Sequence, residues 1–225
     1  MLASLLAILL NGLLAPFVWR YFHRHAGLLL AIVPAACFVW FALQIPEVAG
    51  GGAVFESLAW VPLLDVALGL RLDGLALLFA LLITGIGALI VLYSGAYLGD
   101  HPQLGRFYAS LLIFMMAMLG LVLADDLIAM FVFWELTSVA SYLLISFNHE
   151  KPESRRAALQ ALLITGGGGL ALLAGLILLG IAGDAWQFSQ LQADVIQGHV
   201  LFPAIMALVL IGCFTKSAQF PFHLW

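Results

Sequence analysis

The sequence predicts an all-α fold, a polytopic bundle of about seven transmembrane helices. Three observations lead to this fold class. First, 64% of the 225 residues are hydrophobic and only 9% are charged, a composition that cannot form an ordinary soluble surface. Second, seven segments reach the length of about 20 apolar residues with which a helix crosses a bilayer. Third, lysine and arginine gather in alternate connections, as the positive-inside rule expects of a multi-pass membrane protein.

The predicted spans cover most of the chain. No basic residue precedes the first apolar run, so this run is predicted to be a permanent span rather than a cleaved signal peptide. The connection 46–72 is expected to be the only one large enough to hold structure of its own. The chain therefore divides into 1–72, with two spans and this loop, and 73–225, with the other five. The predicted spans are 2–19, 28–45, 73–98, 104–124, 126–147, 157–182 and 201–224.

The basic residues predict the orientation in the membrane. Six of the eight lie in connections on one side, which the positive-inside rule assigns to the cytoplasm. The other side has only Arg71, and Lys216 lies within a span. We therefore expect a cell membrane protein whose N-terminus is outside. The six cytoplasmic residues are Arg20, Arg24, Arg106, Lys151, Arg155 and Arg156, and the acidic residues of the external loop are Glu47, Glu56 and Asp65.

Composition and motifs exclude several functions. No basic cluster extends beyond short loops, so the chain has no electrostatic footprint for nucleic acid. Cys37 and Cys213 each lie inside an apolar run, where a thiol acts as a small hydrophobe. The glycine run 166–169 is not followed by Gly-Lys-Ser/Thr, which argues against a phosphate-binding loop. No cofactor or metal site is expected, and any redox chemistry is assigned to partner subunits.

Glu135 is the first candidate for chemistry. It follows two helical turns of apolar residues and lies nine positions beyond Asp126, about 13 Å into the membrane at 1.5 Å per residue. A charge at this depth costs a few kcal/mol or more, so such residues usually face the interior of a bundle and mark an ion pathway. The alternative is a protonated carboxyl group that hydrogen-bonds to a neighbouring helix.

Lys216 repeats the argument with the opposite charge. It follows a long apolar run, and snorkelling of its ammonium toward the cytoplasmic interface is the alternative. Opposite charges lower each other's cost by pairing where the dielectric is low. A carboxylate that approaches and leaves a lysine also controls when the lysine releases its proton. The two residues together therefore predict a proton-translocating pair.

Polar residues continue from each of these charges. At about 100° per residue, Ser138, Tyr142, Ser146 and His149 fall on the same helical arc as Glu135. This stripe runs toward the cytoplasm and predicts one wall of a hydrated half-channel, although serine and tyrosine also occur in spans by chance.

A second set of polar residues follows Lys216. The same helical offsets reach Gln219 and His223, if the segment stays helical. Pro221 removes the partner of the Ser217 carbonyl, so a broken helix is predicted between Ser217 and Pro221. Broken helices are tolerated in membranes where they line a cavity. His223 suits a proton relay, with an ordinary histidine at the interface as the alternative.

Other residues are predicted to be structural. Asp73 is expected to cap the N-terminus of the third span. Turn chemistry and attraction of cations explain Asp125 and Asp126 equally well. Close helix packing, or a hinge, is expected of Gly167, Ala171 and Gly175, and apolar packing of Met115, Met116 and Met118.

Four stretches resemble a known family. They are 71–98 (RLDGLALLFALLITGIGALIVLYSGAYL), FVFWELTSVASYLLI around Glu135, ESRRAALQALLITGGGGLALLAGLILL, and FTKSAQFPFHLW around Lys216. These are similar to the A subunit of Mrp-type multisubunit sodium/proton antiporters, and more broadly to the antiporter-like subunits of respiratory complex I and membrane-bound hydrogenases. The resemblance extends over most of the chain from the third span onward.

The resemblance implies a transporter rather than an enzyme. In the family, inverted five-helix repeats carry the proton path, and Glu135 and Lys216 match the pair of the first repeat. The segment 73–225 would be this antiporter-like module, incomplete at its end, in a fragment of a longer chain. H⁺ and Na⁺ are the implied substrates, with other subunits of a membrane complex as partners. The alternatives are a proton-pumping subunit of NADH:quinone oxidoreductase or of a hydrogenase, and a non-transporting membrane scaffold.

Overall fold

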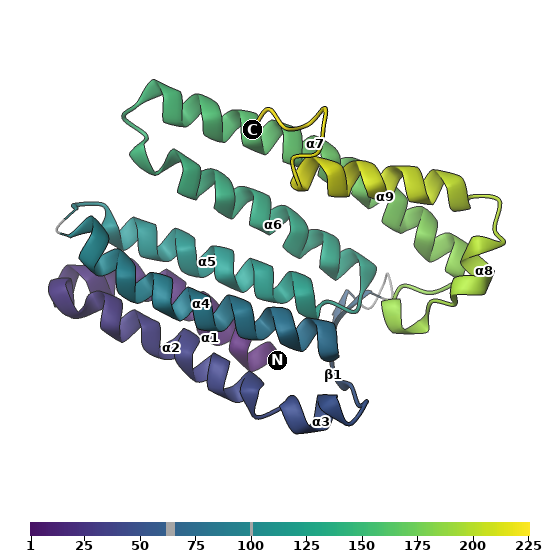
Figure 1. The fold of residues 1–225 in the computed structure, drawn as a ribbon, viewed down its shortest axis with the longest axis horizontal. Coiled ribbons are helices and arrows are strands. Elements are labelled where there is room, and N and C mark those ends of the chain that lie inside the picture. The colour runs from purple at the N-terminus through teal and green to yellow at the C-terminus, as the bar shows by residue number, and fades with distance from the viewer. Residues whose placement is uncertain (62–65, 100) are drawn as a thin grey trace. The chain divides into compact units, whose positions relative to one another are not determined.

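A computed structural model describes residues 1–61, 66–99 and 101–225. The described chain is mostly helical, which confirms the predicted fold class (Figure 1). It forms two compact units. The first contains Met1–Glu56 and Leu70–Leu123, and the second contains Ser57–Gly69 and Ala124–Trp225. The predicted boundary between residues 72 and 73 stays a prediction.

The first unit is built from four long helices. α1 (Leu2–Phe22) packs against α5 (Leu104–Leu123), and α2 (Ala26–Ala42) packs against α4 (Gly74–Leu98). α4 also packs against α5, and α1 against α2, which follows a single 3₁₀ turn at His23–His25. The large outward-facing hydrophobic side chains of α1, α2 and α4 remain exposed, as expected of helices that lie in lipid.

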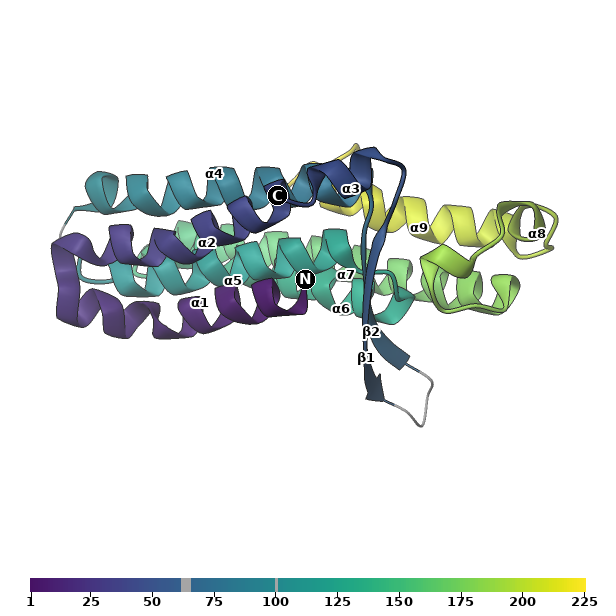
Figure 2. The same cartoon turned by 90° about the horizontal axis from the view of Figure 1, so that it is seen from below.

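The connection 46–72 carries structure, as predicted. It begins within the short helix α3 (Ile45–Ala49), and strands β1 (Val54–Val61) and β2 (Val66–Leu72) pair as a two-stranded sheet (Figure 2). Asp65 lies outside the described residues. The expectation that no other connection holds structure is wrong, because residues 184–201 contain the 3₁₀ turn η4 (Phe188–Gln190) and helix α8 (Ala193–Gln197).

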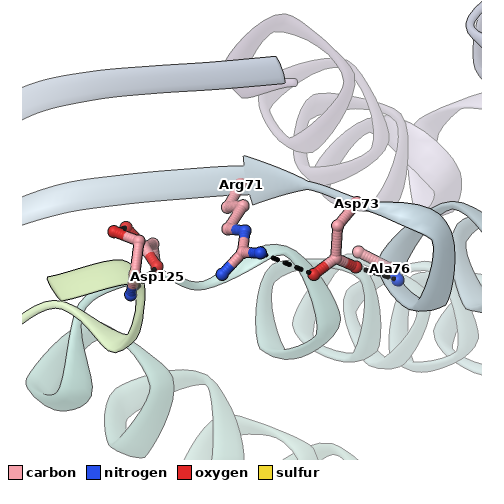
Figure 3. A network of polar contacts seen from close by, with 5 residues as sticks. Arg71, Asp73, Ala76 and Asp125 are labelled. Atoms are coloured by element: carbon pink, nitrogen blue, oxygen red, sulfur yellow. Dashed lines mark hydrogen bonds and ion pairs between the residues drawn. The ribbon is translucent and has the colours of Figure 1, made fainter. Parts of the chain in front are cut away.

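The predicted cap of α4 is confirmed. The Asp73 carboxylate accepts a hydrogen bond from the Ala76 amide at 3.0 Å and forms an ion pair with Arg71 at 3.4 Å (Figure 3). The cap satisfies one of the amides that a helix leaves unpaired in its first turn.

The second unit contains α6 (Leu127–Ile145), α7 (Pro152–Gly183) and α9 (Phe202–Lys216). α7 packs against both of the others (Figure 1). The 3₁₀ turn η3 (Ser146–Asn148) follows α6 and leads toward α7. Leu127, Leu172 and Leu176 form the centre of the hydrophobic core of this unit.

Two aspartates fix the start of α6. The Asp126 carboxylate accepts hydrogen bonds from the amides of Ile128 at 2.9 Å and Ala129 at 2.8 Å. The Asp125 carboxylate accepts the amide and the hydroxyl of Ser189 at 2.9 and 2.6 Å. Both side chains are therefore occupied by turn and cap contacts, which is one of the two explanations that the sequence left open.

The helices fall on the seven predicted spans, but their lengths differ. In the part of the chain that the structure describes, five helical stretches are long and apolar enough to cross a membrane, and the first folds back at His23–His25 into α1 and α2. α9 has only 15 residues and ends at Lys216, well short of the predicted end at 224. The predicted break between Ser217 and Pro221 is confirmed, because no helix continues past Ser217 in the residues that follow. The five stretches are Leu2–Ala49, Gly74–Leu98, Leu104–Leu123, Leu127–Asn148 and Pro152–Gly183.

Candidate functional site

The candidate site lies within the second unit, where α6, α7 and α9 meet. Glu135 is the ninth of the 19 residues of α6, so its carboxyl group lies near the middle of that helix. One carboxyl oxygen, Oε1, is buried, and in the part of the chain that the structure describes it has no hydrogen-bond partner. Buried polar atoms are rarely left unpaired in proteins, which singles out this group as functional or protonated.

The Lys216 ammonium is held by hydroxyl groups of α6. Its Nζ donates to Thr137 Oγ1 at 2.6 Å and to Ser138 Oγ at 2.8 Å. It also lies 3.5 Å from the Trp134 carbonyl and 5.4 Å from the centre of the Trp134 ring, which adds a cation–π contact. All of these partners are uncharged, so the ammonium is bound without a neutralising carboxylate in direct contact.

The two hydroxyls are oriented to accept the ammonium protons. Thr137 Oγ1 donates to the Trp134 carbonyl at 2.7 Å, and Ser138 Oγ lies 3.5 Å from the same oxygen. Because each hydroxyl has one proton and two lone pairs, this leaves the lone pairs for Lys216.

Glu135 and Lys216 do not touch. Among the described residues there is no ion pair between them within 4.0 Å, although the two groups interact electrostatically. Their pairing therefore stays a prediction.

The break after α9 contributes to the lysine site. A helix carries partial negative charge at its C-terminus, and Lys216 is the last residue of α9. Two carbonyls of the final turn are occupied: that of Cys213 accepts from the Ser217 amide at 2.9 Å, and that of Thr215 accepts from Trp225 Nε1 at 2.9 Å. The chain after the break thus returns to cover the helix end.

Glycines of α7 bring the three helices together. A Cβ at Gly168 would overlap Thr215 of α9, and one at Gly212 of α9 would lie 2.7 Å from the Leu172 Cβ. Gly175 packs against α9 as predicted, but Gly167 does not: it is exposed, with open space where its Cβ would be. The predicted face is therefore wrong at Gly167, where Gly168 makes the contact with α9 instead.

The predicted relay residues are not all brought together. Ser138 is in the site, whereas Tyr142 is half-buried farther along α6, Ser146 is half-buried at the start of η3, and His149 is exposed after η3. The relay role of Tyr142, Ser146 and His149 stays a prediction.

Gln219 and His223 lie beyond the end of α9. Both are exposed, and the His223 ring stacks on Phe220 with centroids 5.5 Å apart. The helical offsets that related them to Lys216 do not apply, because the helix has already ended. Their role in a relay also stays a prediction.

Sequence reasoning missed Trp134, Thr137 and Gly169. The sequence did contain a clue to Thr137, because a hydroxyl residue two positions from a glutamate within a predicted span can contact the same site. It contained no clue to Gly169, because one glycine in a run of four cannot be told from its neighbours without the packing of α7. No group of three or more His, Cys, Asp or Glu side chains converges as for a metal in the described residues.

Comparison with known proteins shows what the chain is similar to. Residues 124–225 match the family described as NADH:quinone oxidoreductase/Mrp antiporter, transmembrane, and residues 60–108 match the N-terminus of complex I chain 5. The chain is 47% identical over 220 residues to the Na(+)/H(+) antiporter subunit A1 of Staphylococcus haemolyticus, and 46% identical to that of Staphylococcus aureus. These alignments cover 96% of the chain but only 27% and 28% of the relatives.

Solved structures give the same result. The chain matches the Mrp complex of Dietzia sp. DQ12-45-1b with a TM-score of 0.90 and 35% identity, over 99% of this chain and 24% of that one. Complex I of Thermus thermophilus shares the fold, with a TM-score of 0.75 at 23% identity over 99% of this chain and 45% of that one. Residues 124–225 thus match the transmembrane domain described as NADH:quinone oxidoreductase/Mrp antiporter, and the chain resembles antiporter subunits of this kind over most of its length.

Proposed function

We propose that this chain forms the N-terminal part of the A subunit of a multisubunit Na⁺/H⁺ antiporter, and that Glu135 and Lys216 carry protons through it. The observation that supports this most is the state of the two charges. Lys216 is bound by uncharged groups in the middle of α6, beside a glutamate whose Oε1 has no partner among the described residues. Ionisable groups held in this way inside a membrane typically serve ion pathways.

The hydroxyls of Thr137 and Ser138 suit a lysine that alternates between two protonation states. A hydroxyl accepts from an ammonium and, after rotation, donates to a neutral amine. Thr137 and Ser138 therefore have a hydrogen bond to offer whether or not Lys216 carries its proton. An unprotonated or displaced Glu135 then biases which state the lysine adopts, because its charge acts at short range in a low dielectric.

The identity of the transported cation and of the partners is part of the proposal. Relatives that are 46–47% identical are named Na(+)/H(+) antiporter subunits, and the structural match at 35% identity is to an Mrp complex. The alternative is a proton-pumping subunit of a redox complex; both family models also name an NADH:quinone or NADH-ubiquinone oxidoreductase, but the solved complex I matches at only 23% identity. We also propose the orientation in which the N-terminus is outside and the start of α7 is cytoplasmic.

The test is transport by the complete antiporter complex in sealed vesicles. Glu135→Gln keeps the size of the side chain and removes its charge, and Lys216→Ala removes the ammonium. Each variant should abolish the dissipation of a pH gradient on addition of Na⁺ while the complex stays assembled. Normal transport by assembled Glu135→Gln would mean that the carboxylate is structural, and the proposed function would be wrong.

A further inference from the structure

Gly169 of α7 lies directly against the carboxyl group of Glu135. A Cβ at position 169 would overlap Oε1 of Glu135 and would stand 2.9 Å from its Cδ. The neighbouring turn is close as well, since a Cβ at Gly166 would lie 4.0 Å from Oε2. The carboxyl group therefore rests on the bare backbone of α7 between these two glycines.

We propose that Gly169 is a positioning residue for Glu135, and that the missing side chain at 169 creates the slot in which the carboxyl group is held. The reason is that nothing else fixes the position of Oε1. In the described chain this oxygen has no hydrogen-bond donor, and no ion pair holds the group. Its location is set by shape, and the shape is set by Gly169.

The contacts distinguish Gly169 from glycines that only let helices approach. The three nearest atoms that a Cβ at 169 would meet all belong to the Glu135 carboxyl group. At Gly168 and Gly175 the corresponding atoms belong to α9, to Thr215 in one case and to Val209 and Leu208 in the other. Two adjacent glycines thus have different tasks, because Gly168 admits the helix of Lys216 and Gly169 admits the side chain of Glu135.

This inference rests on the proposed proton path through Glu135. An alanine at 169 has to displace the Glu135 carboxyl group from the slot. The displacement changes the distance between this carboxyl group and the Lys216 ammonium. Displacements of about 1 Å at a reacting group can cost on the order of 100-fold in rate. A loss of ten- to 100-fold in proton-coupled transport is therefore expected of Gly169→Ala.

The chain offers a matched control. Gly167→Ala makes the same substitution two residues away on the same helix, where nothing lies within 4 Å of the new Cβ. In the assembled complex in vesicles, Gly167→Ala should transport as wild type and Gly169→Ala should not. Equal transport by the two variants would overturn the proposal.

A rescue experiment separates positioning from simple misfolding. Glu135→Asp shortens the side chain by one methylene and withdraws the carboxyl group from position 169. The double variant Gly169→Ala/Glu135→Asp should therefore recover assembly or transport relative to Gly169→Ala alone. If Gly169→Ala fails to assemble and the double variant fails equally, the clash is not with Glu135 and the proposal is wrong.

A chemical probe makes the test independent of the proposed function. A hydrophobic carbodiimide modifies protonated carboxyl groups in apolar surroundings, and the modified Glu135 is counted by mass spectrometry. Gly169→Ala should change the rate of labelling several-fold, and Gly167→Ala should leave it unchanged. If Glu135→Gln transports normally, the proposed function fails, yet the labelling result still decides whether Gly169 holds the carboxyl group. Identical labelling in both glycine variants would refute the slot.

Discussion

Lys216 Nζ and Thr137 Oγ1 are 2.6 Å apart, the shortest of the hydrogen bonds between α9 and α6 that hold the ammonium. Thr137 is fully buried, so water cannot replace its hydroxyl without rearrangement. Hydrogen bonds to charged groups contribute about 1.5–3 kcal/mol. The charged lysine therefore depends on a neutral residue that directly follows Glu135 and Leu136 in the chain.

Thr137→Val is expected to lower transport by about tenfold or more, because an energy of about 1.5–3 kcal/mol corresponds to factors of ten to 100. Valine has nearly the shape of threonine and lacks only the hydroxyl, so packing between α6 and its neighbours is preserved. Sodium-dependent dissipation of a pH gradient in vesicles measures the effect. Thr137→Ser keeps the hydroxyl and should retain most of the activity. Transport by Thr137→Val close to wild type would show that the hydroxyl is not needed.

The fold was predictable because membrane spans leave a strong signal in composition. Helix ends were predictable where a chemical cause was visible, as with Pro221, which predicted a break soon after Lys216, although the predicted span still ran to 224. The same proline made the helical offsets from Lys216 to Gln219 and His223 invalid. Local rules thus predicted the break, but not where the chain goes after it.

The candidate site was predicted in its charges and in Ser138, but its other neutral partners were missed. Charged residues in apolar runs are rare and expensive, so Glu135 and Lys216 stood out. Trp134, Thr137 and Gly169 are ordinary residues in membrane helices, and their contacts depend on the rotation of α6 and α7 about their axes. For the same reason the sequence pointed to Gly167, while the contact with α9 is made by its neighbour Gly168.

The Trp134 ring is expected to contribute through its face and not through its N–H group. The Lys216 ammonium lies 5.4 Å from the ring centre, while Trp134 Nε1 is buried with no partner among the described residues. Trp134→Phe keeps an aromatic face and removes the unpaired N–H, so transport should stay near wild type. Trp134→Leu removes the face, at a cost of about 0.5–2 kcal/mol, and should lower transport. Rates in vesicles at matched complex content compare the two, and equal rates would argue against the cation–π contact.

The cap of α6 should matter for stability and not for transport chemistry. Asp126→Ala removes both hydrogen bonds to the first turn, to the amides of Ile128 and Ala129, and should cost about 1 kcal/mol. Thermal unfolding of the purified complex in detergent measures this as a lower midpoint. Asp126→Asn still caps and should unfold close to wild type. If asparagine destabilises as much as alanine, the charge of Asp126 has a role beyond the cap.

The orientation is expected to be cytoplasmic at the start of α7 and external at β1. Lys151, Arg155 and Arg156 gather around Ser154, and the positive-inside rule keeps such a cluster in the cytoplasm. After Cys37 and Cys213 are replaced by alanine, a cysteine at Ser154 should react with an impermeant maleimide only in inverted vesicles. A cysteine at the exposed Ser57 of β1 should react in intact cells, which makes it the matched control. Labelling of Ser154→Cys from outside intact cells would show that the orientation is the reverse of the predicted one. The C-terminal end of α6, toward which Ser138 and Tyr142 run, would then lie at the external surface.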